Sequence, residues 1–478
     1  MNAFELKNVT FQYEGADKPV LTDASFYGKF GEITLLAGYS GDGKSTILEL
    51  LCGIIPNSIS GTVSGEIEIN GKSILGEPIG KICRDVSIVL QNADEQILHQ
   101  TVEDEIAFGC ENFGFSPKII DQKVRESCEL MELDPLWKPR MLSGGQKQRL
   151  ITASSLATGQ KVLLLDEPLA NLDRQGAAFL MQTLTRLAHK LGYAILIVEH
   201  RIDAVLPYID TIWRISGGKL QQVSKEAAAE QTEEVGSASE SSQWIAHENP
   251  LLELKNVRFK ARKREILKDV SFPVYRGEKV LILGENGCGK TTLLRCIAKL
   301  NPLSGGRIEQ ALNPKFSRQK KGTKDWYRHV GMVYQNPNYQ LFMPSVYQEI
   351  YFGCHSEEKT KSILRQFRLE DIQERHPASL SEGQKRRVSV AAILAGEPDI
   401  LLLDEPTVGQ DYENLEDLMA ILNEDCAARG TTLITITHDK RCVRALCDHA
   451  FLLQDGVISE DGDQEFAYHY FCSRIHRI

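Results

Sequence analysis

The sequence predicts two tandem α/β domains, each built around a largely parallel central β-sheet. Its 478 residues are too many for one ordinary core and suit two or three domains. Short apolar segments alternate with helix-forming stretches, as in residues 33–37 followed by residues 45–52. The sequence also repeats, because residues 4–13 and 252–261 read FELKNVTFQY and LELKNVRFKA. A repeat this long indicates two copies of one domain rather than a short-period solenoid.

The repeat divides the chain into a first domain at residues 1–222, a linker at 223–249 and a second domain at 250–478. Residues 225–249 are rich in Ala, Glu, Ser, Gln and Thr, which is typical of a flexible linker, and the segment is acidic. In the first domain, continuous apolar content predicts buried strands at 162–165 and 194–198. An antiparallel β layer is expected to precede them, from residue 4 to residue 26.

Composition limits the classes of function. The chain is 42% hydrophobic and 25% charged, as expected of a globular protein that is neither disordered nor embedded in a membrane. Its longest apolar runs, such as 400–403, are far shorter than the roughly 20 residues of a membrane-spanning helix. Its first residues lack the basic and apolar regions of a secretory signal. We therefore expect that another protein would have to dock it at a membrane.

Charge and cysteine content exclude further classes. A net charge of −10 argues against a nucleic-acid partner, which usually requires a basic face. The basic tract at 315–328 is expected to be an exposed loop rather than a binding patch. The eleven cysteines include no C-x-x-C pair, so we expect reduced thiols rather than disulfides or a zinc site.

Two glycine-rich loops, at 38–46 and 284–292, fit the pattern G-x-x-x-x-G-K-[ST]. Small residues let backbone N–H groups turn inward around phosphate oxygens, and the helix that follows directs its positive end to the same place. A chance turn is excluded because both loops follow an apolar strand. The predicted ATP-binding residues are Gly38, Ser40, Gly41, Gly43, Lys44, Ser45 and Thr46 in the first copy, and Gly284, Asn286, Gly287, Gly289, Lys290, Thr291 and Thr292 in the second.

Within each loop, Lys44 or Lys290 is expected to reach the β and γ phosphates, and Ser45 or Thr291 to bind Mg²⁺. An acidic pair ends a later apolar strand in each copy, at 166–167 and 404–405. A carboxylate at such a strand end, Asp166 or Asp404, can hold Mg²⁺. The next residue, Glu167 or Glu405, can orient or deprotonate the attacking water. Alone, such a pair could be a turn that ends a strand, but its place after a phosphate loop favours catalysis.

Between the loops and the acidic pairs, residues 142–149 read LSGGQKQR and residues 380–387 read LSEGQKRR. Motifs in this order resemble the ATP-binding-cassette (ABC) family over nearly the whole chain. The resemblance implies, in each copy, a P-loop core with a parallel sheet, an antiparallel β subdomain and an α-helical signature subdomain. It also implies ATP hydrolysis with ATP and Mg²⁺ as cofactors.

By this resemblance, the signature residues begin helices whose N-termini face the γ-phosphate held by the opposite domain. They are Ser143, Gly144, Gly145 and Gln146 in the first copy and Ser381, Gly383 and Gln384 in the second. A helix start with free N–H groups suits an anion. The two domains would thus pair within one chain around two nucleotides, with a higher assembly left open.

The resemblance assigns further roles. Gln91 and Gln335 are similar to loop glutamines that contact Mg²⁺ and water, and His200 and His438 to switch histidines that contact the γ-phosphate. Residues 171–173 and 409–411 resemble loops that cross the interface between domains. The expected catalytic residues are Glu167, Glu405, His200, His438, Gln91 and Gln335. The expected Mg²⁺ ligands are Ser45, Gln91, Asp166, Thr291, Gln335 and Asp404.

The two sites are expected to differ. Tyr13 resembles the aromatic residue that stacks on adenine, but the matching residue of the second copy is Ala261. Stacking is therefore lost there, or an arginine such as Arg262 replaces it, or the stretch is a solvated loop. Glu382 stands in the second signature where the first has Gly144. A carboxylate repels a triphosphate unless it points away, so we expect unequal hydrolysis rates.

The segments after the two glutamines, 91–109 and 335–353, follow the pattern QNPxxQLF and then TVxxEIxFG. The pattern resembles the ATPases of energy-coupling-factor importers, although the first copy departs from it with Ala93 and with Ile97-Leu98. This resemblance implies a transmembrane scaffold subunit gripped by these segments and a separate substrate-binding membrane subunit. It also implies a peripheral location at the cytoplasmic face of the cell membrane and uptake of a vitamin, metal ion or related micronutrient.

Three alternatives remain open at this stage. One is a fused sugar-importer ATPase, although the second cassette of that class is usually degenerate and both copies here keep their lysine, acidic pair and histidine. Another is a soluble two-cassette protein acting on the ribosome, although such proteins carry a long, mostly basic linker. The third is a module that uses ATP only as a clamp.

Overall fold

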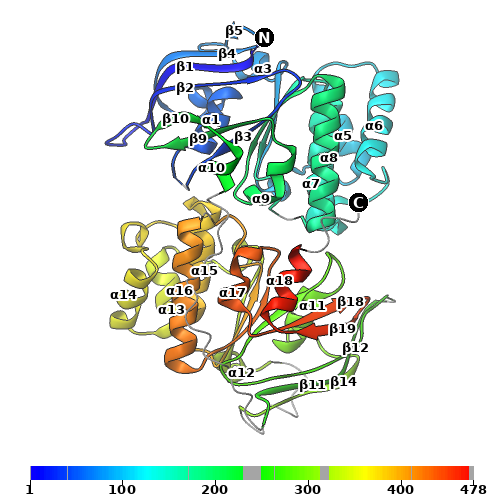
Figure 1. The fold of residues 1–478 in the computed structure, drawn as a ribbon, viewed down its shortest axis with the longest axis vertical. Helices are drawn as coiled ribbons and strands as arrows, with labels where there is room; N and C mark the ends of the chain where they lie inside the picture. Colours follow the sequence, from blue (N-terminus) through cyan, green and yellow to red (C-terminus); the bar gives the residue numbers. More distant parts are fainter. Residues whose placement is uncertain are drawn as a thin grey trace. The chain divides into compact units, whose positions relative to one another are not determined.

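The computed structural model describes residues 2–39, 41–170, 172–229, 249–262, 264–312, 322–410 and 412–472. The chain forms two compact units, Met1–Glu233 and Glu234–Ile478 (Figure 1). Both units are α/β, and each contains a parallel sheet and an antiparallel layer, so the predicted fold class is confirmed.

The first unit has a six-stranded sheet in the order β10-β9-β3-β8-β7-β6. Strands β6, β7, β8, β3 and β9 are parallel, and β10 pairs antiparallel with β9. A four-stranded antiparallel sheet, β2-β1-β4-β5, forms the second layer. The strands are β1 (Asn2–Tyr13), β2 (Leu21–Lys29), β3 (Ile33–Ala37), β4 (Gly61–Ile69), β5 (Lys72–Ser73), β6 (Val86–Val89), β7 (Val162–Asp166), β8 (Ala194–Val198), β9 (Thr211–Ser216) and β10 (Lys219–Val223).

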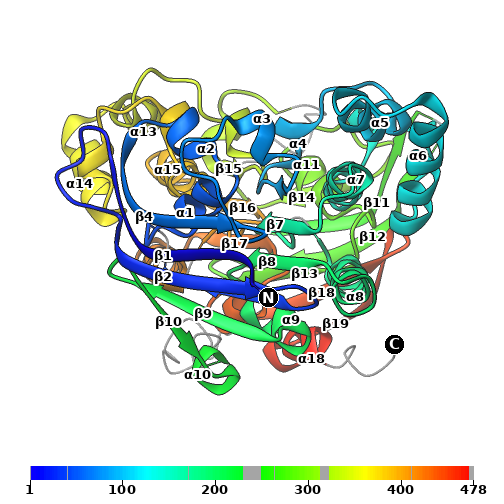
Figure 2. The same cartoon turned by 90° about the horizontal axis from the view of Figure 1, so that it is seen from above.

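Three helices of the first unit, α5, α6 and α7, pack on one another as a helical subdomain (Figure 2). The helix α1 follows the glycine loop directly, and α8 covers the parallel sheet. The helices are α1 (Lys44–Leu51), α2 (Ile54–Asn57), α3 (Ile79–Ile82), α4 (Ala93–Gln96), α5 (Val102–Asn112), α6 (Pro117–Met131), α7 (Gly144–Ala157), α8 (Arg174–Leu191), α9 (Ile202–Val205) and α10 (Lys225–Ala229).

The second unit repeats this plan in one nine-stranded sheet, β14-β11-β12-β19-β18-β13-β17-β16-β15. A single bridge, Asp269 with Val457, joins its antiparallel layer to the rest. The strands are β11 (Leu252–Ala261), β12 (Arg264–Val274), β13 (Lys279–Leu283), β14 (Gly305–Gln310), β15 (Val330–Val333), β16 (Ile400–Asp404), β17 (Thr432–Ile436), β18 (His449–Gln454) and β19 (Val457–Gly462). The helices are α11 (Lys290–Ile297), α12 (Trp326–His329), α13 (Val346–Cys354), α14 (Glu357–Gln366), α15 (Glu382–Leu394), α16 (Tyr412–Arg429), α17 (Val443–Leu446) and α18 (Gln464–Cys472).

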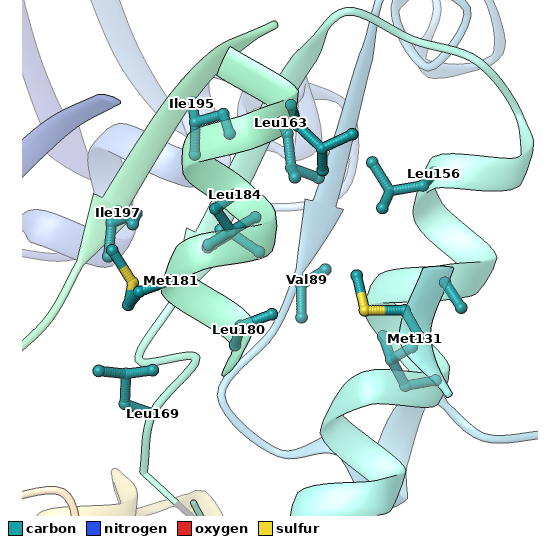
Figure 3. Close-up of a cluster of buried hydrophobic side chains, with 14 of the residues drawn as sticks. Val89, Met131, Leu156, Leu163, Leu169, Leu180, Met181, Leu184, Ile195 and Ile197 are labelled. Atoms are coloured by element: carbon teal, nitrogen blue, oxygen red, sulfur yellow. The ribbon is translucent and has the colours of Figure 1, made fainter. Parts of the chain in front are cut away.

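The core of the first unit fixes the sheet against its helices. Figure 3 shows Leu180, Met181 and Leu184 of α8 beside Ile195 and Ile197 of β8. All five side chains are buried, and burying each contributes about 1.5–3 kcal/mol. The apolar strands predicted at 162–165 and 194–198 are therefore buried as expected, and their polar ends are held in place.

The end of the first unit extends into the segment that composition assigned to the linker. Residues 225–229 form α10, Ala228 is buried in the first unit, and the Arg214 guanidinium donates to the Ala227 carbonyl. The remaining predicted linker residues, 230–248, lie outside the described part of the chain. Helix propensity and one buried alanine thus outweigh the polar composition at 225–229.

The basic tract at 315–328 also departs from expectation at its end. Residues 313–321 lie outside the described ranges, but Trp326 begins α12 and is fully buried. Its indole Nε1 donates to the Ala298 carbonyl at 3.1 Å, and the Lys299 ammonium lies 4.3 Å from the ring centroid. This end of the tract is therefore part of the core. Among the described helices, none has the length and apolar content needed to cross a bilayer.

Replacing Trp326 with alanine should destabilise the second unit by about 3–5 kcal/mol, because it leaves a large cavity and an unpaired carbonyl. Urea unfolding followed by circular dichroism measures this loss. Its neighbour Tyr327 is exposed and provides the matched control, with an expected loss of less than about 1 kcal/mol for Tyr327→Ala. Equal losses for the two variants would contradict the assignment of Trp326 to the core.

Candidate active site

The glycine loop of the first unit joins β3 to α1. Gly41 and Gly43 have φ values of 86° and 102°, a left-handed backbone that favours glycine. A Cβ on Gly43 would also lie 2.7 Å from the Val20 side chain. The Lys44 ammonium donates to the carbonyls of Gly38 and Tyr39, at 2.9 and 2.7 Å. A cation therefore lies across the loop, at the N-terminus of α1, where an anion is stabilised.

The loop of the second unit has the same geometry. The Lys290 ammonium donates to the Gly284 and Glu285 carbonyls, at 2.6 and 2.9 Å. The loop forms one wall of a cavity of about 380 Å³, a volume within the usual range of small-molecule sites. Gln335, Asp404 and Glu405 line the same cavity. Among the predicted ATP-binding residues, Ser40 lies outside the described residues.

A hydroxyl and a carboxylate meet in each unit. The Ser45 hydroxyl donates to Asp166 Oδ2 at 3.3 Å, and the Thr291 hydroxyl donates to Asp404 Oδ1 at 3.1 Å. These hard oxygen atoms are the donors that Mg²⁺ prefers, and the ion would complete its shell with water and phosphate oxygens, so the residues present fit Mg²⁺. Burial, followed by the nearby charge of Glu167, raises the pKa of Asp166 to about 7, and a neighbouring cation favours its ionised form.

The next glutamate is held in a left-handed turn, with φ of 46° at Glu167, and its N–H donates to the Val198 carbonyl at 2.8 Å. Its carboxylate accepts a hydrogen bond from the Gln91 amide at 2.8 Å and lies 3.2 Å from His200 Nε2. Burial raises the pKa of Glu167, but His200, Lys44 and Gln91 together lower it below the usual value. The side chain is therefore an ionised acceptor at the edge of the sheet.

The matching glutamate of the second unit lies in the same kind of turn and beside the matching histidine. Glu405 has φ of 52°, and its N–H donates to the Ile436 carbonyl at 2.9 Å. His438 Nε2 lies 3.4 Å from one Glu405 carboxylate oxygen and 3.1 Å from Asn286 Oδ1. The histidine thus links the acid to the glycine loop. Gln335 lines the cavity beside Glu405.

Each signature sequence begins a helix with a reciprocal cap. The Ser143 hydroxyl accepts from the Gln146 N–H at 3.3 Å, and the Gln146 side chain accepts from the Ser143 N–H at 2.9 Å. Ser381 and Gln384 repeat these bonds at 3.3 and 3.1 Å. Gly144 and Gly145 form the first turn of α7. The caps fix the direction in which each helix N-terminus points.

The second signature neutralises its own acid. The Lys385 ammonium donates to Glu382 Oε1 at 2.8 Å, so this carboxylate is paired along its own helix. The Gly383 carbonyl accepts from the Gln410 amide at 2.9 Å, which joins the signature to the loop at 409–410. The cavity around Lys290 has none of the signature residues in its described lining. Asn171 and Asp411 of the predicted interface loops lie outside the described residues.

Tyr13 lies against the helix that follows the glycine loop. Its hydroxyl is 2.7 Å from Thr46 Oγ1 and donates to Glu49 at 3.3 Å. In the second unit, Arg262, one of the alternatives considered for this role, is not among the residues that line the cavity, whereas Arg264 is. Arg262 lies in the turn between β11 and β12, with φ of 55°.

Two charged residues in the first unit were not foreseen from sequence. Glu199 accepts from the N–H groups of His200 and Arg201, at 3.0 and 3.1 Å, and from that of Leu169 at 3.1 Å. Arg201 donates to the carbonyls of Leu169 and Leu172. The pair fixes the loop after Glu167 relative to the histidine. The sequence does contain a signal for this pair, because both charged residues flank His200 directly after a wholly apolar strand.

The chain belongs to the ABC transporter family, because the sequence model of that family matches residues 21–170 and 267–408. It is an ATPase with two fused cassettes. It is 32% identical over 510 residues to the Bacillus subtilis (strain 168) protein described as "Putative HMP/thiamine import ATP-binding protein YkoD", covering 97% of this chain and 92% of that protein. It is also 32% identical, over 524 residues, to an ABC transporter ATP-binding protein of Methanosarcina mazei, covering 96% and 88% of the two chains.

Solved structures extend the likeness of the fold. The archaeal ABCE1 chain in a structure of ribosome-bound Pelota and ABCE1 matches with a TM-score of 0.73 and 19% identity, covering 97% of this chain and 80% of that chain. A second archaeal ABCE1, in complex with the ribosomal stalk protein aP1, matches with a TM-score of 0.66 and 18% identity, covering 98% and 92%. At these identities the matches show a shared two-cassette fold and no shared role.

Removing the loop lysines should remove nucleotide binding one site at a time. We expect Lys44→Ala and Lys290→Ala each to leave about one bound ATP per chain, and the double variant to lose ATP binding and hydrolysis, because the ammonium groups that bind the phosphates are lost. Equilibrium dialysis counts the bound nucleotide. Lys81→Ala, which removes an exposed lysine paired with Glu77, is the control and should bind normally. Undiminished ATPase in the double variant would contradict this assignment.

Proposed function

We propose that this ATPase is the motor subunit of an importer of the energy-coupling-factor type. It would work at the cytoplasmic face of the cell membrane, on a transmembrane scaffold subunit and a separate subunit that binds a vitamin, metal ion or related micronutrient. The name of the Bacillus subtilis relative, an import ATP-binding protein, supports this direction of transport. The pattern around Gln91 and Gln335 supports the importer type.

The observation that carries the proposal is a pair of exposed apolar surfaces just after the two glutamines. In the first unit Leu98 is 68% exposed, and in the second Tyr339 and Phe342 are 76% and 66% exposed. Phe108 and Phe352 on the following helices are also exposed. Exposed large apolar side chains mark interaction sites, and side chains of this kind suit the apolar face of an amphipathic helix.

These surfaces are held rigidly. The buried carboxylate of Glu105 accepts from the N–H groups of Leu98 and His99, both at 2.8 Å. Glu349 accepts in the same way from Phe342, at 3.0 Å, and from Met343, at 2.8 Å. Because backbone N–H groups are fixed by a buried acceptor, the apolar side chains project from a defined loop. A rigid surface of this kind transmits movement to a bound helix.

Within each site, we assign the loop lysines to the β and γ phosphates and Tyr13 to the adenine of the first site. Mg²⁺, held by Ser45 with Asp166 or by Thr291 with Asp404, would neutralise phosphate charge, and Gln91 and Gln335 would approach it as further ligands. Glu167 and Glu405 would hold the attacking water in line, since each carboxylate lies at the sheet edge where a parallel strand ends. His200 and His438 would donate to the γ-phosphate.

The signature helices would complete the opposite sites. Their N-terminal N–H groups and the serines Ser143 and Ser381 suit a γ-phosphate. Two ATP molecules would then close the cassettes on each other, and hydrolysis would reopen them and move the scaffold.

The alternatives carry less support. The ABCE1 structures share 18–19% identity with this chain, which does not extend to a role on the ribosome. A degenerate second cassette, typical of fused sugar importers, is not seen here, because Lys290, Asp404, Glu405 and His438 are all present.

Hydrolysis at the two sites should differ. We expect Glu167→Gln and Glu405→Gln each to slow single-turnover hydrolysis at its own site by about 10²-fold, because the general base is lost. The residual rates should be unequal, since the second signature carries the charged pair Glu382 and Lys385 where the first has Gly144 and Lys147. Rapid-quench measurement of bound γ-labelled ATP gives both rates. Equal residual rates would refute the inequality.

Charging the apolar surfaces should release the membrane partner. We expect Leu98→Glu with Phe342→Glu to abolish copurification of integral membrane subunits from detergent-solubilised native membranes, because a carboxylate cannot be buried against an apolar helix. ATPase activity of the isolated chain should persist. Leu191→Glu, at an exposed leucine at the end of α8, is the control and should copurify normally. An unmodified chain that brings down no integral membrane protein would refute the importer proposal.

A further inference from the structure

The two signature helices are tied to their glutamine loops in different ways. In the first unit, the Lys147 ammonium of α7 donates to Asp94, three residues after Gln91, at 2.5 Å. The matching position of the second unit is Asn338, which carries no charge, and its lysine pairs with Glu382 instead. The second unit therefore lacks this surface ion pair between signature helix and glutamine loop.

A buried arginine provides the second link. Arg386 of α15 is 3% exposed, and its guanidinium donates to the Tyr334 carbonyl at 3.4 Å. Tyr334 directly precedes Gln335. The Nε of Arg386 has no hydrogen-bond partner among the described residues, so neutral groups satisfy this cation only in part. A buried charge of this kind needs compensation from nearby charges of the opposite sign.

That compensation comes from three acids: Glu382 on the same helix, followed by the catalytic pair Glu405 and Asp404. Val333 of β15 pairs in register with Leu403 of β16, so Tyr334 and Asp404 leave the sheet side by side. The guanidinium bonded to Tyr334 therefore lies near the strand end that carries Asp404. Burial lowers the pKa of Arg386 to about 10, and the charges of Glu382, Glu405 and Asp404 oppose that shift. The acids and the arginine therefore share one electrostatic environment.

The first unit has the same pairing of strand ends but no arginine at the position of Arg386. Val89 pairs with Leu165, so the strand ends leave the sheet in the same way. The residue that matches Arg386 is Gln148, which is 1% exposed and neutral. The acidic pair of the first unit is therefore not backed by a cation at this position.

A fixed buried cation acts on both components of a bound nucleotide. It attracts the triphosphate and repels Mg²⁺, and salt screens it little because it is out of solvent. Both effects lower the dependence of binding on Mg²⁺. We propose that Arg386 is a positioning residue that places a permanent positive charge behind Asp404 and Glu405, so that the second site binds ATP with a weaker requirement for Mg²⁺ than the first. This proposal rests on the nucleotide sites proposed above.

The test compares ATP affinity in EDTA with ATP affinity in Mg²⁺, one site at a time. Lys44→Ala leaves the second site, and Lys290→Ala leaves the first. We expect the ratio of the two dissociation constants, EDTA over Mg²⁺, to be smaller for the second site by roughly fivefold or more. Adding Arg386→Gln to Lys44→Ala should raise the ratio toward that of the first site. Adding Gln148→Arg to Lys290→Ala should lower the ratio of the first site.

Arg386→Lys separates charge from packing, because it keeps the cation and loses the planar guanidinium. It should keep the low ratio, whereas a ratio that rises as far as in Arg386→Gln would overturn the electrostatic role. An unchanged ratio in Arg386→Gln would overturn it as well. If Arg386→Gln does not fold, Gln148→Arg decides alone, and no change in its ratio overturns the proposal. Loss of ATP binding in Mg²⁺ by both single-lysine variants would instead refute the nucleotide sites themselves.

Discussion

One constraint organises both cassettes: polar chemistry can begin only where a buried parallel strand ends. Strands β7 and β16 are apolar until their last residue, and the glutamate that follows turns left-handed. The N–H of that glutamate bonds to the last carbonyl of the neighbouring strand, at Val198 or Ile436. This bond leaves the backbone satisfied and turns the carboxylate toward the glycine loop and the histidine. The geometry of the site thus follows from how the sheet edge closes.

The sequence predicted features that a local pattern records. The glycine loops, the acidic pairs and strands β3 and β8 lie where spacing and apolar runs put them, because each depends on neighbouring residues. Features that depend on distant contacts were missed. The bond from Trp326 to Ala298 buries a tract that looks basic and exposed, and burial of Ala228 turns predicted linker into helix. No local signal reports either partner.

The glutamates Glu105 and Glu349 show how a pattern acquires a physical meaning. In the sequence, each is the glutamate of the TVxxEIxFG pattern that resembles importer ATPases. In the structure each is a buried carboxylate that accepts two backbone N–H groups and orders the loop that presents Leu98 or Phe342. A glutamine oxygen could accept both bonds, but it is neutral, so the bonds would be weaker, and its amide would bury a donor as well. The acid therefore suits this loop better than an amide, and it orders the segment that presents the exposed apolar side chain.

The difference between the cassettes lies in charge and not in backbone. Both keep the same caps, strand register and left-handed glutamate, so a substitution at a buried position changes the field without moving the frame. Glu382 would oppose a nucleotide, yet Lys385 neutralises it one turn along its own helix. Arg386 is different because no single acid pairs with it, and its charge is left to act on the site. A rigid frame with one unpaired buried cation is the condition under which two similar sites acquire different electrostatics.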